Sequence, residues 1–110
     1  MILVDSSVWI DFFRDGQCTQ SQALARCLGD SSVEVGMADL VLFEVMRGFR
    51  EGALMREAQT LMSALPQVEI GGTSAVLKAA ERYRQLRSRG RTVRSPIDVL
   101  LASYCITNGH

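Results

Sequence analysis

Three carboxylates stand at places in the sequence where a charged side chain needs an explanation. Asp5 directly follows the apolar run at residues 2–4, and Glu44 is the only charged residue in the apolar segment 40–46. Asp98 stands at the start of another apolar segment. Burying an unpaired carboxylate is costly, so such a residue needs a cation, a metal ion or a wet cleft. Oxygen donors of this kind are the ligands that a hard cation such as Mg²⁺ prefers.

Each of these carboxylates also has a structural explanation, and the sequence leaves both explanations open. Asp5 is able to cap the following helix, although the two serines after it are equally good cap residues. Glu44 is able to form a buried ion pair with an arginine. Asp98 lies three residues after Ser95, which is the spacing of a capping box. A simpler structural role, that of a helix cap, is expected for Asp39.

Short apolar runs that alternate with helical patterns must position these residues. Runs rich in β-branched and other apolar side chains predict buried strands at about residues 2–4, 33–37 and 68–70. Apolar periodicity and capping residues predict helices at about residues 8–14, 22–28, 40–50, 53–65, 73–88 and 97–107. This order predicts an α/β fold with a parallel sheet. Ligands of such sheets bind beyond the carboxyl ends of the strands, where Asp5 is expected.

Length and composition limit the classes of function. The 110 residues are expected to form one domain over 1–110, and an apolar content of 47% is ordinary for a globular protein. The formal net charge of zero excludes a uniformly basic nucleic-acid binder. The three cysteines form no C-x-x-C pair and the only histidine is His110, so neither zinc nor a histidine base is indicated. A reducing cytosol fits this cysteine pattern best.

Positive charge is concentrated in one segment of the chain. Residues 78–94 hold seven basic side chains against Glu81 alone, a local charge of +6, whereas residues 1–77 hold five basic and ten acidic side chains. This asymmetry is able to steer RNA towards the molecule, and the alternative is a solvated helix face. The residues assigned to RNA binding on this ground are Arg82, Arg87, Arg89, Arg91 and Arg94.

The opening residues 1–11, MILVDSSVWID, resemble the start of PIN-domain ribonucleases, and most of all the VapC toxins of toxin–antitoxin pairs. The resemblance continues at Glu44 in its apolar helix. It recurs at residues 95–103, SPIDVLLAS, where such toxins carry an aspartate before an apolar helix. It implies an α/β/α sandwich with a short central parallel sheet, and an endoribonuclease that depends on Mg²⁺ or Mn²⁺.

The resemblance also implies roles and partners. It assigns Asp5, Glu44 and Asp98 as metal ligands and catalytic residues, with Ser6 supporting the site. It implies a homodimer, a VapB-type antitoxin and a cytoplasmic location. The family commonly has a fourth acidic residue and a last strand after the Asp98 helix. The 110 residues do not reach them, so the domain is expected to be C-terminally short. The alternative is a catalytically incomplete PIN-like module that binds RNA or protein, and a third hypothesis is a nuclease acting on DNA or structured RNA.

Overall fold

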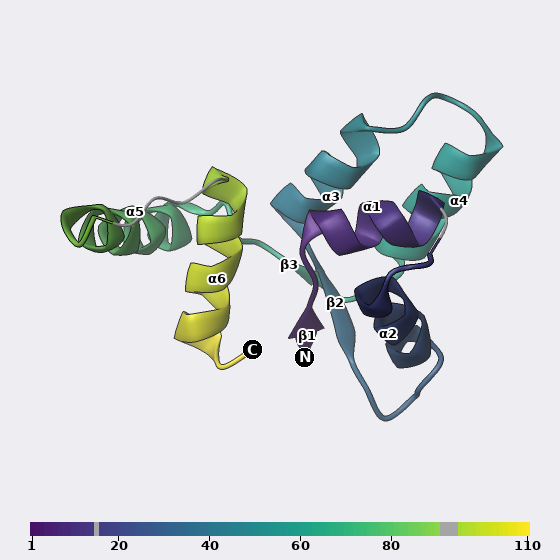
Figure 1. Ribbon diagram of the computed structural model, residues 1–110, viewed down its shortest axis with the longest axis horizontal. Helices are drawn as coiled ribbons and strands as arrows, with labels where there is room; N and C mark the ends of the chain where they lie inside the picture. Colours follow the sequence, from purple (N-terminus) through teal and green to yellow (C-terminus); the bar gives the residue numbers. More distant parts are fainter. Residues whose placement is uncertain (15, 91–94) are drawn as a thin grey trace.

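A computed structural model describes residues 1–14, 16–90 and 95–110 of the chain (Figure 1). A sheet lies at its centre, formed by β1 (Ile2–Leu3), β2 (Val35–Ala38) and β3 (Gln67–Val68). The three strands are parallel and β2 is the middle one. The predicted α/β class with a parallel sheet is confirmed. The middle strand begins two residues later than predicted, at Val35. The third strand was predicted over residues 68–70 but ends at Val68, and Ile70 is fully buried although it lies outside the strand.

Helices make up most of the described chain. They are α1 (Ser6–Arg14), α2 (Thr19–Leu28), α3 (Asp39–Arg47), α4 (Ala53–Ser63), α5 (Thr73–Ser88) and α6 (Pro96–Asn108). The α2 helix begins earlier than predicted because Cys18 is its N-cap, and the Cys18 sulfur accepts a hydrogen bond from the Ser21 N–H at 3.4 Å. The α3 helix ends earlier than predicted because Gly48 is its C-cap.

The core of the protein surrounds β2. All four residues of β2 are buried, which is typical of a parallel strand that is covered on both faces. The largest fully buried side chains include Trp9, Met37 and Met62. Trp9 stacks on Phe13 with 5.9 Å between the ring centroids, and both residues belong to α1. Because Trp9 belongs to the buried core cluster that also contains Met37 and Met62, its burial anchors α1 to the core.

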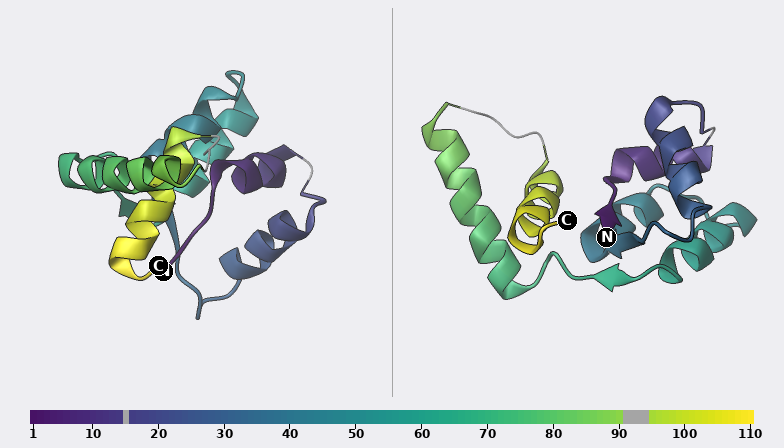
Figure 2. Two further views of the ribbon diagram at one scale, coloured as in Figure 1. Left: turned by 60° about the vertical axis from the view of Figure 1, so that its left-hand side comes forward. Right: turned by 90° about the horizontal axis from the view of Figure 1, so that it is seen from below.

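The helices α5 and α6 pack mainly on each other. Figure 1 and the right-hand view of Figure 2 show α6 between α5 and β1, so that the first turn of α6 lies near the start of α1. The Arg82 guanidinium of α5 joins the two helices. Its Nη1 donates to the Ser103 carbonyl at 2.6 Å, to the Ser103 hydroxyl at 2.7 Å and to the Thr107 hydroxyl at 3.0 Å. Within the described ranges, no helix combines the length and apolar character of a membrane span.

Candidate functional site

Asp5 lies between β1 and α1, at the carboxyl end of the first strand. Its Oδ1 accepts hydrogen bonds from the Ser7 hydroxyl at 2.7 Å and from the Val8 N–H at 3.2 Å. One carboxylate oxygen therefore caps α1, as the structural explanation requires. The part of the chain that the structure describes offers no hydrogen bond to the other oxygen, Oδ2. Asp5 is exposed, so this second oxygen is open to a ligand.

Glu44 projects from the middle of α3, and its side chain is 15% exposed. Its Oε1 accepts a hydrogen bond from the Ser6 hydroxyl at 3.0 Å, across 38 residues of sequence. Its Oε2 lies 3.9 Å from Arg47 Nη2. The alternative of a buried ion pair is only partly realised, because the Arg47 side chain is 64% exposed and an ion pair of this kind is weak. The hydrogen bond from Ser6 is therefore the better defined restraint on Glu44.

Asp98 lies in the first turn of α6 and is exposed. Ser95 is the N-cap of α6, but its side chain makes no capping hydrogen bond, so the predicted capping box does not form on that side. Partial burial raises the pKa of Asp98 above its ordinary value, and the negative charges of Asp5 and Glu44 raise it further. Asp5 and Glu44, from two other parts of the chain, therefore each lie close enough to Asp98 to repel its charge.

Repulsion among carboxylates is relieved by a cation, and the donor set fits a divalent one. Arg47 is the one cationic side chain in the described ranges that forms an ion pair with any of the three carboxylates. No three acidic, cysteine or histidine side chains within those ranges gather closely enough to ligate one ion together. Mg²⁺ commonly keeps several water ligands and takes only one or two carboxylates. An ion at this place would therefore contact one or two of the carboxylates, with water completing its coordination.

Asp39 illustrates an acidic residue with a purely structural role. The prediction that it caps α3 is wrong in detail, because Ala38 is the N-cap and Asp39 is the first helical residue. Its Oδ1 instead accepts hydrogen bonds from the Leu40 N–H and from the Ile70 N–H, both at 2.9 Å. Asp39 therefore ties the start of α3 to the segment that follows β3.

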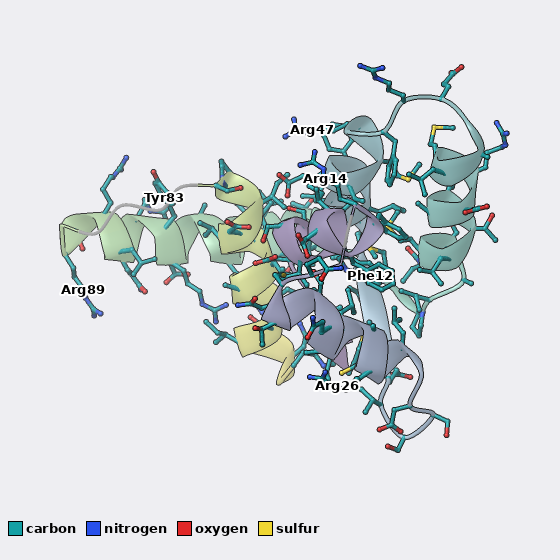
Figure 3. The ribbon with its side chains drawn as sticks, turned by 45° about the vertical axis from the view of Figure 1, so that its right-hand side comes forward. Phe12, Arg14, Arg26, Arg47, Tyr83 and Arg89 are labelled. Carbon is teal, nitrogen blue, oxygen red and sulfur yellow. The ribbon has the colours of Figure 1, made fainter. Side chains whose placement is uncertain are left out.

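The arginines assigned to RNA binding have different surroundings. Arg82 is engaged with α6 through the three hydrogen bonds given above, so its guanidinium serves the packing of two helices rather than an open surface. Arg87 lies over the exposed Tyr83 ring, with 5.9 Å from its Cζ to the ring centroid, and Arg89 is exposed. Figure 3 shows Tyr83 and Arg89 on α5 and Arg47 on α3, on either side of α6. Arg91 and Arg94 lie outside the described residues.

Two residues beside Glu44 were missed by the sequence analysis. Phe43 is 57% exposed, and Arg47 lies over its ring with 5.8 Å from its Cζ to the centroid. The spacing of four residues places both side chains on one face of α3. That spacing is visible in the sequence, but the exposure of Phe43 is not, because the segment around it is apolar.

Comparison with known proteins places this geometry in a family. The chain is 28% identical over 109 residues to the VapC ribonuclease Mb1587 of Mycobacterium bovis and to ribonuclease VapC11 of Mycobacterium tuberculosis. Each alignment covers 99% of this chain and 81% of the relative. The fold is similar to that of a chain in the crystal structure of VapBC2 from Rickettsia felis bound to a DNA fragment from their promoter. The TM-score is 0.70 at 14% identity, over 97% of this chain and 80% of the other. The family model of the PIN domain matches residues 2–110, and the chain therefore belongs to the PIN-domain family, as its opening motif indicates.

Proposed function

We propose that the chain is a VapC-type toxin that hydrolyses RNA phosphodiester bonds with the help of Mg²⁺ or Mn²⁺. The observation that carries the proposal is that Asp5 and Glu44 both act on the charge of Asp98, although the three residues come from three parts of the sequence, while the Ser6 hydroxyl holds Glu44 beside the start of α1. The two mycobacterial relatives are named ribonucleases, which favours this activity over a module that only binds. The proposal assigns the three carboxylates as the catalytic residues of a metal site, in which one or two of them would contact the ion and water would complete its coordination.

The chain's own residues each have a part in this mechanism. A divalent ion held by these carboxylates would lower the pKa of bound water and neutralise charge on the phosphate. The hydrogen bond from Ser6 orients Glu44, and the Val8 N–H and the Ser7 hydroxyl orient one oxygen of Asp5. Asp98 approaches from α6 and has no hydrogen bond or ion pair to the described residues, so its oxygens remain available.

The proposed partners are RNA, a VapB-type antitoxin and a second copy of the chain, in the cytoplasm. The structural neighbour is a VapBC2 protein, which supports an antitoxin partner for a chain of the same fold. For RNA, the described arginines with open guanidinium groups are Arg87 and Arg89. Arg91 and Arg94 remain assigned to RNA binding from the sequence. Arg82 is assigned to helix packing instead.

The test of the proposed function is cleavage of RNA by the purified chain, with Mg²⁺, with Mn²⁺ or with EDTA. We expect cleavage only with a divalent ion. Asp5→Asn and Asp98→Asn should each lower the rate at least about 100-fold, because even residues that merely orient metal ligands are worth 10- to 100-fold. Glu57→Gln on the exposed face of α4 is the matched control and should cleave normally. Circular dichroism checks that each variant is folded.

Two results would contradict the proposal. Cleavage that persists in EDTA would show that the reaction needs no divalent metal. Full activity in both aspartate variants would show that the assigned residues are not the catalytic site. Binding of RNA by a folded protein without any cleavage would favour the alternative of a binding module.

A further inference from the structure

An aromatic ring and a guanidinium lie together on the surface of α3, immediately beside Glu44. Phe43 is 57% exposed, and the Cζ of Arg47 lies 5.8 Å from the centroid of its ring. The Arg47 side chain is itself 64% exposed. The same α3 helix buries Val41 and Val45 in the core, so the Phe43–Arg47 pair lies on the opposite, outward part of the helix. The pair therefore presents a large apolar surface and a positive charge to solvent.

Exposure of a single apolar side chain is common and needs no explanation. Leu54 of α4, for example, is 53% exposed. Phe43 differs in two respects. A guanidinium lies over its ring, and the same guanidinium reaches to 3.9 Å from the Oε2 of Glu44. Arg47 thus links the exposed ring to the carboxylate site within one turn of helix.

We propose that Phe43 and Arg47 form a stacking platform for one unpaired nucleobase of an RNA strand that is bound at the carboxylates. This inference rests on the proposed function and adds a substrate-positioning role for two residues outside the carboxylate set. Bases in single strands stack on aromatic side chains and on arginine planes without regard to sequence. Arginine also binds phosphate oxygens. Arg47 is therefore able to hold the phosphate next to the stacked base.

A protein partner fits this surface less well. The chain has a separate apolar cleft of about 500 Å³, which is lined mainly by residues such as Ile10, Phe13 and Phe49. Phe43 and Arg47 are not part of that lining. A positive group over an aromatic ring, beside a site proposed for phosphate chemistry, complements a nucleic acid strand rather than an apolar helix.

The test uses the full chain in an Asp98→Asn background, which keeps the RNA intact. Single-stranded RNA with 2-aminopurine at one position at a time is titrated with protein in Mg²⁺, and fluorescence and anisotropy are recorded. We expect quenching at one position, which reports a stacked base. Phe43→Ala should abolish that quenching and weaken binding about fivefold to a hundredfold, the usual effect of removing a base-stacking aromatic. Phe43→Trp should restore both.

The controls separate stacking from other roles. Leu54→Ala removes a side chain of similar exposure and should leave RNA binding unchanged. A fully paired RNA of the same sequence should bind independently of Phe43, because its bases are not available for stacking. Equal binding by the parent and the Phe43→Ala variant would overturn the inference, as would an equal loss for single and paired strands. A change of oligomeric state in size-exclusion chromatography of Phe43→Ala would assign the pair to a protein interface and overturn it too.

Failure of the inference is distinguishable from failure of the proposed function. Metal-dependent cleavage without any dependence on Phe43 would remove the platform alone. If quenching depends on Phe43 but the parent protein never cleaves RNA, the stacking platform is supported as an RNA-binding feature and the proposed catalysis is contradicted.

Discussion

Replacing Arg82 tests whether its guanidinium holds α6 in place. Nη1 makes three contacts, at 2.6 Å, 2.7 Å and 3.0 Å, but it carries only two hydrogens, so two of the contacts share one donor. A hydrogen bond to a charged group is worth about 1.5–3 kcal/mol, which puts two such bonds at roughly 3–6 kcal/mol. Ser103 is 3% exposed, so its hydroxyl loses a partner when Arg82 is removed.

That sum is an upper bound for Arg82→Ala. The Ser103 hydroxyl is able to turn towards the carbonyl one turn earlier in α6, which recovers part of the loss. We expect the free energy of unfolding to fall by about 2–3 kcal/mol, and the melting temperature to fall by on the order of 10 °C. The assay is urea unfolding followed by circular dichroism, combined with hydrogen exchange of the α6 amides, which should become faster.

Arg84→Ala is the matched control for this experiment. Arg84 is an exposed arginine of the same helix and has no recorded hydrogen bond or ion pair with the described residues. Its replacement should change the free energy of unfolding by less than about 0.5 kcal/mol. If the two variants unfold alike, or if α6 exchange is unchanged in Arg82→Ala, the assignment of Arg82 to helix packing is refuted. Arg82 would then return to the arginines that are available to RNA.

Two further predictions concern the carboxylates. Asp98→Asn should raise the free energy of unfolding by a few tenths to about 1 kcal/mol at neutral pH and low salt, because partial desolvation disfavours the charge of Asp98 and because Asp5 and Glu44 repel it. The pKa of Asp98 is raised in the folded state, so its ionisation opposes folding as the pH rises above 3.8. In urea unfolding, the stability gained by Asp98→Asn should therefore disappear below that pH. A stability gain that persists below it would contradict the electrostatic cause. Ser6→Ala should lower the rate of RNA cleavage about 10-fold, because Glu44 loses the hydrogen bond that orients it. Ser6→Thr keeps a hydroxyl and should restore the rate. An unchanged rate in Ser6→Ala would show that the hydrogen bond does not orient the carboxylate.

The sequence by itself determined the order of the elements and the chemical nature of the site. Short apolar runs bounded by turn residues predicted three parallel strands, and apolar spacing predicted the long helix that ends at Ser88, although its N-cap is Gly72 and not the expected Thr73 or Ser74. The opening motif, Glu44 in its apolar helix and the segment around Asp98 together indicated the family, which the match over residues 2–110 confirms. The carboxylate types at residues 5, 44 and 98 were also readable, because a charge within an apolar pattern is a local feature. Their roles as metal ligands and catalytic residues stay a prediction.

The exact ends of the helices were less predictable, because several neighbouring residues are able to cap the same helix. Cys18 caps α2 with a weak sulfur acceptor, a role that serines and threonines usually take. Asp39 was expected to cap α3 but instead joins α3 to Ile70, 31 residues later. When a side chain has several possible hydrogen-bond partners, the packing of the whole chain decides which of them it contacts. A short stretch of sequence does not describe that packing.

Only the tertiary structure decided which side chains meet. The hydrogen bond from Ser6 to Glu44 spans 38 residues, and that from Arg82 to Ser103 spans 21 residues. Charge density alone placed Arg82 among the RNA-binding arginines, and the packing of α5 against α6 engaged its guanidinium in hydrogen bonds to Ser103 and Thr107. Packing had the opposite effect on Phe43, an apolar residue in an apolar segment that the fold leaves exposed beside the carboxylates. Residue type and spacing set the chemistry that a side chain offers, whereas burial and partners depend on how whole helices pack.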